Sequence, residues 1–171
     1  MTDHAGTRPA AWRGGWDEGA DSLFPGREQD RADEPEYRTL TYEVTGRIAR
    51  ITFDRPEHGN AITADTPLEL AATVERADLD PCVHVILLSG RGKGFCGGYD
   101  LGVFAENSGG SGGQPGATTG TVLDPIVQAR NHDPFTNWDP MADYAMMSRF
   151  NRGFASLLHA NKPTVAKIHG F

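Results

Sequence analysis

The stretch GKGFCGGYDL, residues 92–101, follows a run of apolar residues and contains four glycines. Glycine weakens regular strands and helices. A cluster of this kind therefore indicates unusual dihedral angles, a close approach of the main chain to another group, or simple flexibility. The stretch does not have the G-x-x-x-x-G-K-[ST] pattern of a nucleoside triphosphate loop. Taken alone, it fits a tight strand-to-helix connection, a phosphate-binding nest of N–H groups, or a loop that offers one N–H group to a ligand.

The residues before this stretch predict two strands, a helix and a third strand. Apolar residues alternate over LTYEVTGRIARITF, residues 40–53, with a break at Gly46, which predicts a hairpin. TPLE, residues 66–69, has the spacing of a capping box with proline at the first helical position, and predicts a helix from about Pro67 to Ala77. The apolar run at 83–88 predicts a strand buried on both faces.

The residues after the glycine-rich stretch predict an insertion, a helix and a fourth strand. Residues 105–138 include SGGSGGQPGATTG, and we expect a flexible insertion there. Asp139 and Pro140 have the residue types of a helix start. In that helix one apolar stripe is predicted to face the core: Met147, Phe150, Phe154 and Leu157. TVAKI, residues 164–168, predicts the last strand.

Composition restricts the class of protein. Residues 1–36 have no sustained apolar periodicity, so we expect a disordered N-terminal arm followed by one folded domain, residues 37–171. A net charge of −7 disfavours nucleic acid as a partner. Neither of the two cysteines lies in a zinc-binding pattern, which indicates reduced thiols and no metal. Because no stretch is apolar enough to span a bilayer, we expect a cytoplasmic protein without a membrane partner.

Four segments in order resemble the crotonase superfamily, that is, the enoyl-CoA hydratase/isomerase family. They are ARITFDRPEHGNAI (49–62), VHVILLSG (83–90), GKGFCGGYDL (92–101) and NKPTVAKIHGF (161–171). The resemblance covers residues 37–171. It implies an α/β fold, a crotonase-like right-handed spiral of ββα units, here incomplete because the match stops before the family's second oxyanion-hole glycine.

The resemblance also implies a function and a set of site residues. The function would be that of an enzyme of fatty acid metabolism that binds acyl-CoA thioesters, with coenzyme A as part of the substrate and no other cofactor. The main-chain N–H of Tyr99 would be one oxyanion donor, and its side chain would narrow the acyl pocket. The other substrate-binding residues implied by the family pattern are Asn60, Ala61, Ile62, Phe95, Cys96, Gly97, Gly98, Asp100 and Leu101. A complete family member would form a homotrimer or a hexamer.

Several roles stay open at the level of the sequence. Asp100 suits a helix cap or a catalytic base, and Cys96 suits packing or a nucleophile. Arg55 suits a phosphate ligand or a brace for its turn, and His169 is a candidate acid or base. The acid and base carboxylates of the family would follow Phe171, so we expect the chain to be inactive as a fragment. The alternatives are a non-catalytic acyl-CoA-binding or interaction module, and a chain that does not fold.

Overall fold

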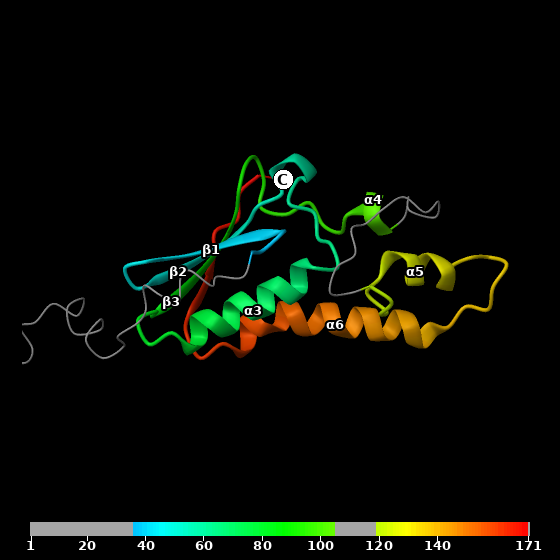
Figure 1. Ribbon diagram of the computed structural model, residues 1–171. Coiled ribbons are helices and arrows are strands. Elements are labelled where there is room, and N and C mark those ends of the chain that lie inside the picture. Colours follow the sequence, from blue (N-terminus) through cyan, green and yellow to red (C-terminus); the bar gives the residue numbers. More distant parts are fainter. Residues whose placement is uncertain (1–35, 105–118, 171) are drawn as a thin grey trace, which may run out of the picture. The chain divides into compact units, whose positions relative to one another are not determined.

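The computed structural model describes residues 36–104 and 119–170, so the expected arm at 1–36 lies almost wholly outside the described residues. The first five elements are β1 (Leu40–Thr45), β2 (Ile48–Phe53), the 3-10 turn η2 (Pro56–His58), α3 (Thr66–Leu79) and β3 (Val85–Gly90). The remaining four are α4 (Leu101–Phe104), α5 (Pro125–Asn131), α6 (Pro140–His159) and β4 (Thr164–Ala166). The predicted order of strand, strand, helix, strand is confirmed (Figure 1).

One mixed sheet carries the strands in the order β1-β2-β3-β4. The β1-β2 pair is antiparallel, and the other two pairs are parallel. The hairpin turns at Gly46, whose φ is +57°, a value that glycine adopts without the cost paid by other residues. The predicted hairpin is therefore confirmed.

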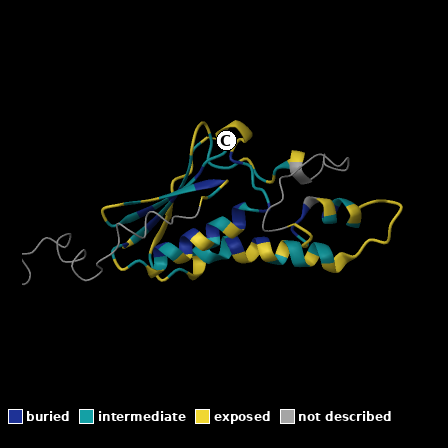
Figure 2. Ribbon diagram, in the orientation of Figure 1, coloured by how far each residue is buried: buried dark blue, intermediate teal, exposed yellow. Residues whose placement is uncertain are grey.

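The core lies on the face of the sheet that packs against α3. Alternate residues of β2 and β3 are buried, as the colours of these strands show (Figure 2). Because successive side chains of a strand point to opposite faces, the partially exposed residues between them belong to the other face. The core cluster joins Ile51 and Ile86 of the sheet to Leu70 and Val74 of α3, each at most 3% exposed. The expectation that β3 is buried on both faces is wrong, because its burial alternates with the period of two of a strand covered on one side.

The start of α3 differs from the predicted capping box. The helix begins at Thr66, and the preceding Asp65 makes no side-chain capping bond. The Glu69 carboxylate instead accepts hydrogen bonds from the main-chain N–H groups of Arg38 and Thr39, at 2.8 and 2.9 Å, and from the Thr39 hydroxyl. Glu69 therefore ties α3 to the residues that lead into β1. The spacing of Glu69 from Thr66 predicts a capping box and does not reveal this contact.

The expected irregular segment at 105–138 contains a helix, α5, at Pro125–Asn131, and its other described residues are turns or irregular. Asp124 precedes α5, and its carboxylate accepts a hydrogen bond from Ile126 N at 2.9 Å. Asp139 does the same for α6, where it accepts from Met141 N at 2.9 Å. The two helices thus share an Asp-Pro start, and the signal for α5 was obscured by the glycine-rich residues before it. Residues 105–118 lie outside the described part of the chain.

The predicted stripe of α6 is correct except at Met147. Phe150 is 1% exposed and packs with Ala64 and Leu123 in a second small core. Phe154 and Leu157 are partly buried against the main core, whereas Met147 is 38% exposed. Figure 1 shows α3 beside the later half of α6, and Met147 precedes that half. None of the helices in the described ranges is both long and apolar enough to span a bilayer.

Candidate functional site

The glycine-rich loop folds back over the end of β3. Arg91 N donates to Phe53 O at 2.8 Å, which continues the pairing of β2 and β3 by one residue. A Cβ atom at Gly90 would lie 2.4 Å from Phe95 O, far inside van der Waals contact. The Phe95 ring meets the core residue Phe53 edge to face, with ring centroids 5.6 Å apart. The loop is thus anchored on the hydrophobic core at Phe95, and Gly90 provides the space that this packing requires.

Asn60 joins this loop to the segment that follows β2. Its residue is 3% exposed and adopts φ of +55°, in the left-handed region. The side-chain Oδ1 accepts from Arg55 N at 2.9 Å, and Nδ2 donates to Arg91 O and to Gly94 O, both at 2.8 Å. Because all three partners are main-chain groups, the Asn60 side chain holds two loops together and is not presented to a ligand.

An isolated parallel bridge then pairs Ile62 with Tyr99. Ile62 N donates to Gly98 O at 2.8 Å, and Asp100 N donates to Ile62 O at 2.9 Å. In a parallel bridge of this kind the central residue on one side directs its N–H away from the partner strand. The Tyr99 N–H is that group, and neither hydrogen bond of the bridge uses it. Gly98, with φ of +98°, allows the turn that precedes it.

Arg55 and Asp100 form an ion pair beside this bridge. Arg55 Nη2 lies 2.9 Å from Asp100 Oδ2, and the two side chains are 16% and 13% exposed. Arg55 Nη1 donates to Ala61 O at 2.7 Å. Of the two roles considered for Arg55, the structure favours the brace. Asp100 was considered as a helix cap or as a catalytic base, and neither role includes a pair with an arginine. Arg55 and Asp100 are 45 residues apart in sequence.

The main chain of residues 60–62 is largely engaged within the protein. Asn60 N donates to Arg55 O at 2.8 Å, and Ala61 N donates to His58 O at 3.1 Å. Ile62 uses both its N–H and its carbonyl in the bridge to the glycine-rich loop. Contact of these three residues with coenzyme A therefore stays a prediction, and it would have to come from atoms other than these N–H groups.

The side chains around Tyr99 differ in exposure. The Tyr99 ring stacks on Phe150 of α6, with centroids 5.8 Å apart and an interplanar angle of 17°, and the residue is 42% exposed. Leu101 is 68% exposed, while Cys96 is half-buried and carries a free thiol. The aromatic ring is thus held on one face by the second core and exposed on part of its surface.

His169 and Gly170 close the other side of the loop. Phe95 N donates to His169 O at 2.9 Å. His169 Nε2 lies 3.0 Å from Gly92 O, and since a carbonyl only accepts, this nitrogen carries the proton. A Cβ at Gly170 would lie 2.4 Å from Lys93 O. These contacts use His169 to hold the loop, so its candidate role as an acid or base receives no support from the geometry.

Residues 92–97 also fit the spacing G-x-G-x-x-G of a dinucleotide-binding loop. That motif works by directing N–H groups at a pyrophosphate from the start of a helix. Here Phe95 N and Gly97 N donate to His169 O and Gly59 O instead, and the helix that follows, α4, has four residues. The arrangement therefore does not suit a dinucleotide.

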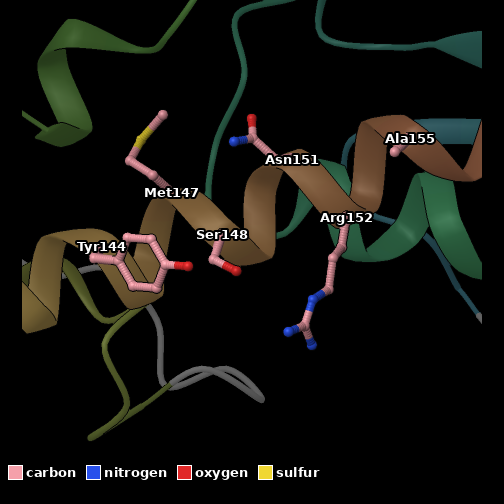
Figure 3. A pocket seen from close by; sticks show the side chains of 6 residues that line it. All are labelled: Tyr144, Met147, Ser148, Asn151, Arg152 and Ala155. Atoms are coloured by element: carbon pink, nitrogen blue, oxygen red, sulfur yellow. The ribbon is translucent and has the colours of Figure 1, made fainter.

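A shallow hollow lies on a different part of the molecule, along one side of α6 (Figure 3). Its lining side chains recur at helical spacing, and Figure 3 shows them projecting from the same helix: Tyr144, Met147, Ser148, Asn151, Arg152 and Ala155. None of the residues predicted to bind substrate contributes to it.

A separate polar cluster joins α5 and α6, where Trp138 Nε1 donates to Asp143 Oδ2 at 2.8 Å and lowers the pKa of that carboxyl.

Comparison with known proteins agrees with the family suggested by the four segments. The model of the enoyl-CoA hydratase/isomerase family matches residues 43–129. A probable enoyl-CoA hydratase of Mycobacterium tuberculosis, EchA14, is 27% identical over 135 residues, which cover 79% of this chain and 41% of the relative. A probable enoyl-CoA hydratase of Rhodobacter capsulatus is 38% identical over 97 residues, 54% of this chain and 34% of the relative.

A solved structure extends the agreement to the fold. The crystal structure of an enoyl-CoA hydratase from Mycobacterium smegmatis is 63% identical and superimposes with a TM-score of 0.66, over 79% of this chain and 41% of that one. The chain thus spans about two fifths of the length of these relatives. The predicted crotonase-like α/β fold is confirmed, and this chain belongs to the enoyl-CoA hydratase/isomerase family.

Proposed function

We propose that this chain binds an acyl-CoA thioester at the glycine-rich loop and that the Tyr99 main-chain N–H donates a hydrogen bond to the thioester oxygen. The reaction class would be hydration or isomerisation of an enoyl-CoA, with coenzyme A as part of the substrate and no separate cofactor. The observation that carries the proposal is the direction of the Tyr99 amide. The bridge hydrogen bonds of Ile62 turn that amide to the side away from the strand partner.

The chemistry explains why such a direction matters. A thioester oxygen gains negative charge when the α carbon loses a proton or the β carbon accepts a nucleophile. A rigid N–H aimed at that oxygen lowers the barrier, and one such donor is typically worth about 2.7–4 kcal/mol. Main-chain donors suit this task because the fold fixes their direction before the substrate arrives. The bridge at Ile62 and the anchor at Phe95 would provide that rigidity.

Among the described residues, the candidate for the oxyanion hydrogen-bond donor is clearer than any candidate for a catalytic acid or base. Asp100, the carboxylate next to Tyr99 in sequence, is paired with Arg55. We therefore expect residues 36–104 and 119–170 to support binding of a thioester without appreciable turnover. The same observation favours a second candidate, a non-catalytic acyl-CoA-binding module, which would bind in the same way in a longer chain but catalyse nothing.

The test is a calorimetric titration of the 171-residue chain with butyryl-CoA and with S-butyl-CoA, a thioether that lacks the carbonyl oxygen. Tighter binding of the thioester is the expected result, because only the thioester offers an acceptor to Tyr99. Equal affinity for the two compounds, or no binding by a chain shown to be folded, would contradict the proposal. Turnover of crotonyl-CoA by a longer version of the chain separates the enzyme from the binding module.

A further inference from the structure

We infer that Arg55 is a positioning residue, which sets the direction of the Tyr99 amide through its contacts with Asp100 and Ala61. The inference rests on the proposed function, since it concerns the same oxyanion donor. It assigns to Arg55 a role in orienting the donor, rather than contact with the substrate.

The guanidinium joins the flanks of both bridge partners. Ala61, whose carbonyl accepts from Nη1 at 2.7 Å, immediately precedes Ile62. Asp100, whose carboxylate accepts from Nη2 at 2.9 Å, immediately follows Tyr99. One planar group thereby fixes the spacing of the two strands at the position where they pair. Lysine could not replace it, because a single ammonium nitrogen does not present two donors in this fixed geometry.

The bridge is short, and the residues that lead into Tyr99 are glycines. It is an isolated bridge and not part of a longer ladder. Gly97 and Gly98 precede Tyr99, and glycine permits a wide range of backbone rotation. Asn60 holds the earlier part of the loop through Arg91 O and Gly94 O. The ion pair acts at the opposite end, after Tyr99, so the peptide that carries the amide is held from both sides.

The Arg55–Asp100 pair is largely buried, so loss of one charge affects the other strongly. With side chains 16% and 13% exposed, the two charges are poorly screened by water. A buried pair adds little net stability when compared with apolar residues, but loss of one partner leaves the other charge poorly compensated. Without Arg55, the Asp100 carboxylate would lose this counter-charge one residue from the amide at which negative charge is proposed to develop. Repulsion would then add to the loss of orientation.

The experiment compares variants of the 171-residue chain by the ratio of their affinities for butyryl-CoA and S-butyl-CoA. Each titration is made at a temperature at which thermal melting shows the variant to be folded. In Arg55→Met the preference for the thioester is expected to fall about fivefold, the value of roughly one hydrogen bond, while affinity for the thioether changes little. Arg55→Lys should not restore the preference. Asp100→Asn should lose less of it, because an amide oxygen still accepts from Arg55.

A matched control is Arg38→Met, which removes an exposed pair with Asp65 at 3.7 Å and should leave the ratio unchanged. A folded Arg55→Met chain that keeps the wild-type preference would overturn the inference. If the wild-type chain itself shows no preference, the proposed function fails, and the brace is then judged by hydrogen exchange without ligand. Faster exchange of the Ile62 and Asp100 amides in Arg55→Lys, with α3 unaffected, supports the brace, and unchanged exchange refutes it.

Discussion

Gly153 allows α6 to lie directly against the first turn of α3, and its replacement by alanine sets two effects against each other. Alanine favours a helix over glycine by about 1 kcal/mol. A Cβ at this position, however, would lie 2.4 Å from Pro67 O and 2.5 Å from Pro67 Cβ. Ordinary carbon contacts are near 3.5–4.0 Å, so the two helices would have to separate by about 1 Å. Neither proline atom belongs to a flexible side chain that could move aside.

Insertion of an extra methyl group into a packed core costs about 1–3 kcal/mol. Contact of this methyl group with main-chain atoms favours the upper end of that range. After the gain in helix propensity, we expect Gly153→Ala to lower the free energy of unfolding by about 2 kcal/mol. The assay is urea denaturation followed by circular dichroism, with an unchanged slope m. Asn151→Ala, at an exposed position of the same helix, should instead stabilise by about 0.5 kcal/mol. An unchanged or raised stability in Gly153→Ala would refute the reasoning.

Three further changes test the loops and the end of α3. Gly98→Ala should cost about 1–3 kcal/mol from backbone strain alone, since φ is +98° and no atom lies within 4 Å of the new Cβ; a neutral result in denaturation would show that the loop adjusts. Asn60→Ala removes the three hydrogen bonds of a buried side chain and should cost about 3 kcal/mol or more, so a smaller loss would mean that water replaces the side chain. The pKa of Asp78 is lowered from 3.8, chiefly by the hydrogen bond from Asn161 N. Its stabilisation is therefore complete above the unfolded pKa and is lost as pH falls through the lower folded value. Melting curves between about pH 2 and pH 6 should show a weaker acid dependence in Asp78→Asn, and identical curves would contradict this.

The elements were predictable where the signal is local. Alternation over residues 40–53 predicts β1 and β2 because a strand exposes its two faces in turn. Asp139 and Pro140 predict the start of α6 because capping joins residues two positions apart. The same dipeptide at Asp124 and Pro125 carried equal information about α5. The glycine-rich residues before it favour irregular structure over the whole segment, and this composition outweighs the local helix signal.

Other outcomes depended on neighbours that are distant in sequence. Glu69 fits a capping box by its spacing, yet its carboxylate binds Arg38 N and Thr39 N about thirty residues earlier. Met147 fits the apolar stripe of α6, but it precedes the half of the helix that lies beside α3. In both cases the local pattern allows more than one arrangement, and tertiary packing decides which partner is within reach.

The sequence by itself determined the order of the strands and of the two long helices α3 and α6, the family, and the position of the glycine-rich loop, because these follow from short-range periodicity and from four segments in a fixed order. Only the tertiary structure showed that Asn60 holds the loop, that Arg55 pairs with Asp100, and that Ile62 forms a bridge whose two hydrogen bonds do not use the Tyr99 N–H. A hydrogen bond requires its two atoms within about 3 Å and correctly aligned. For residues 30 to 45 positions apart, only the folded chain brings them to that distance.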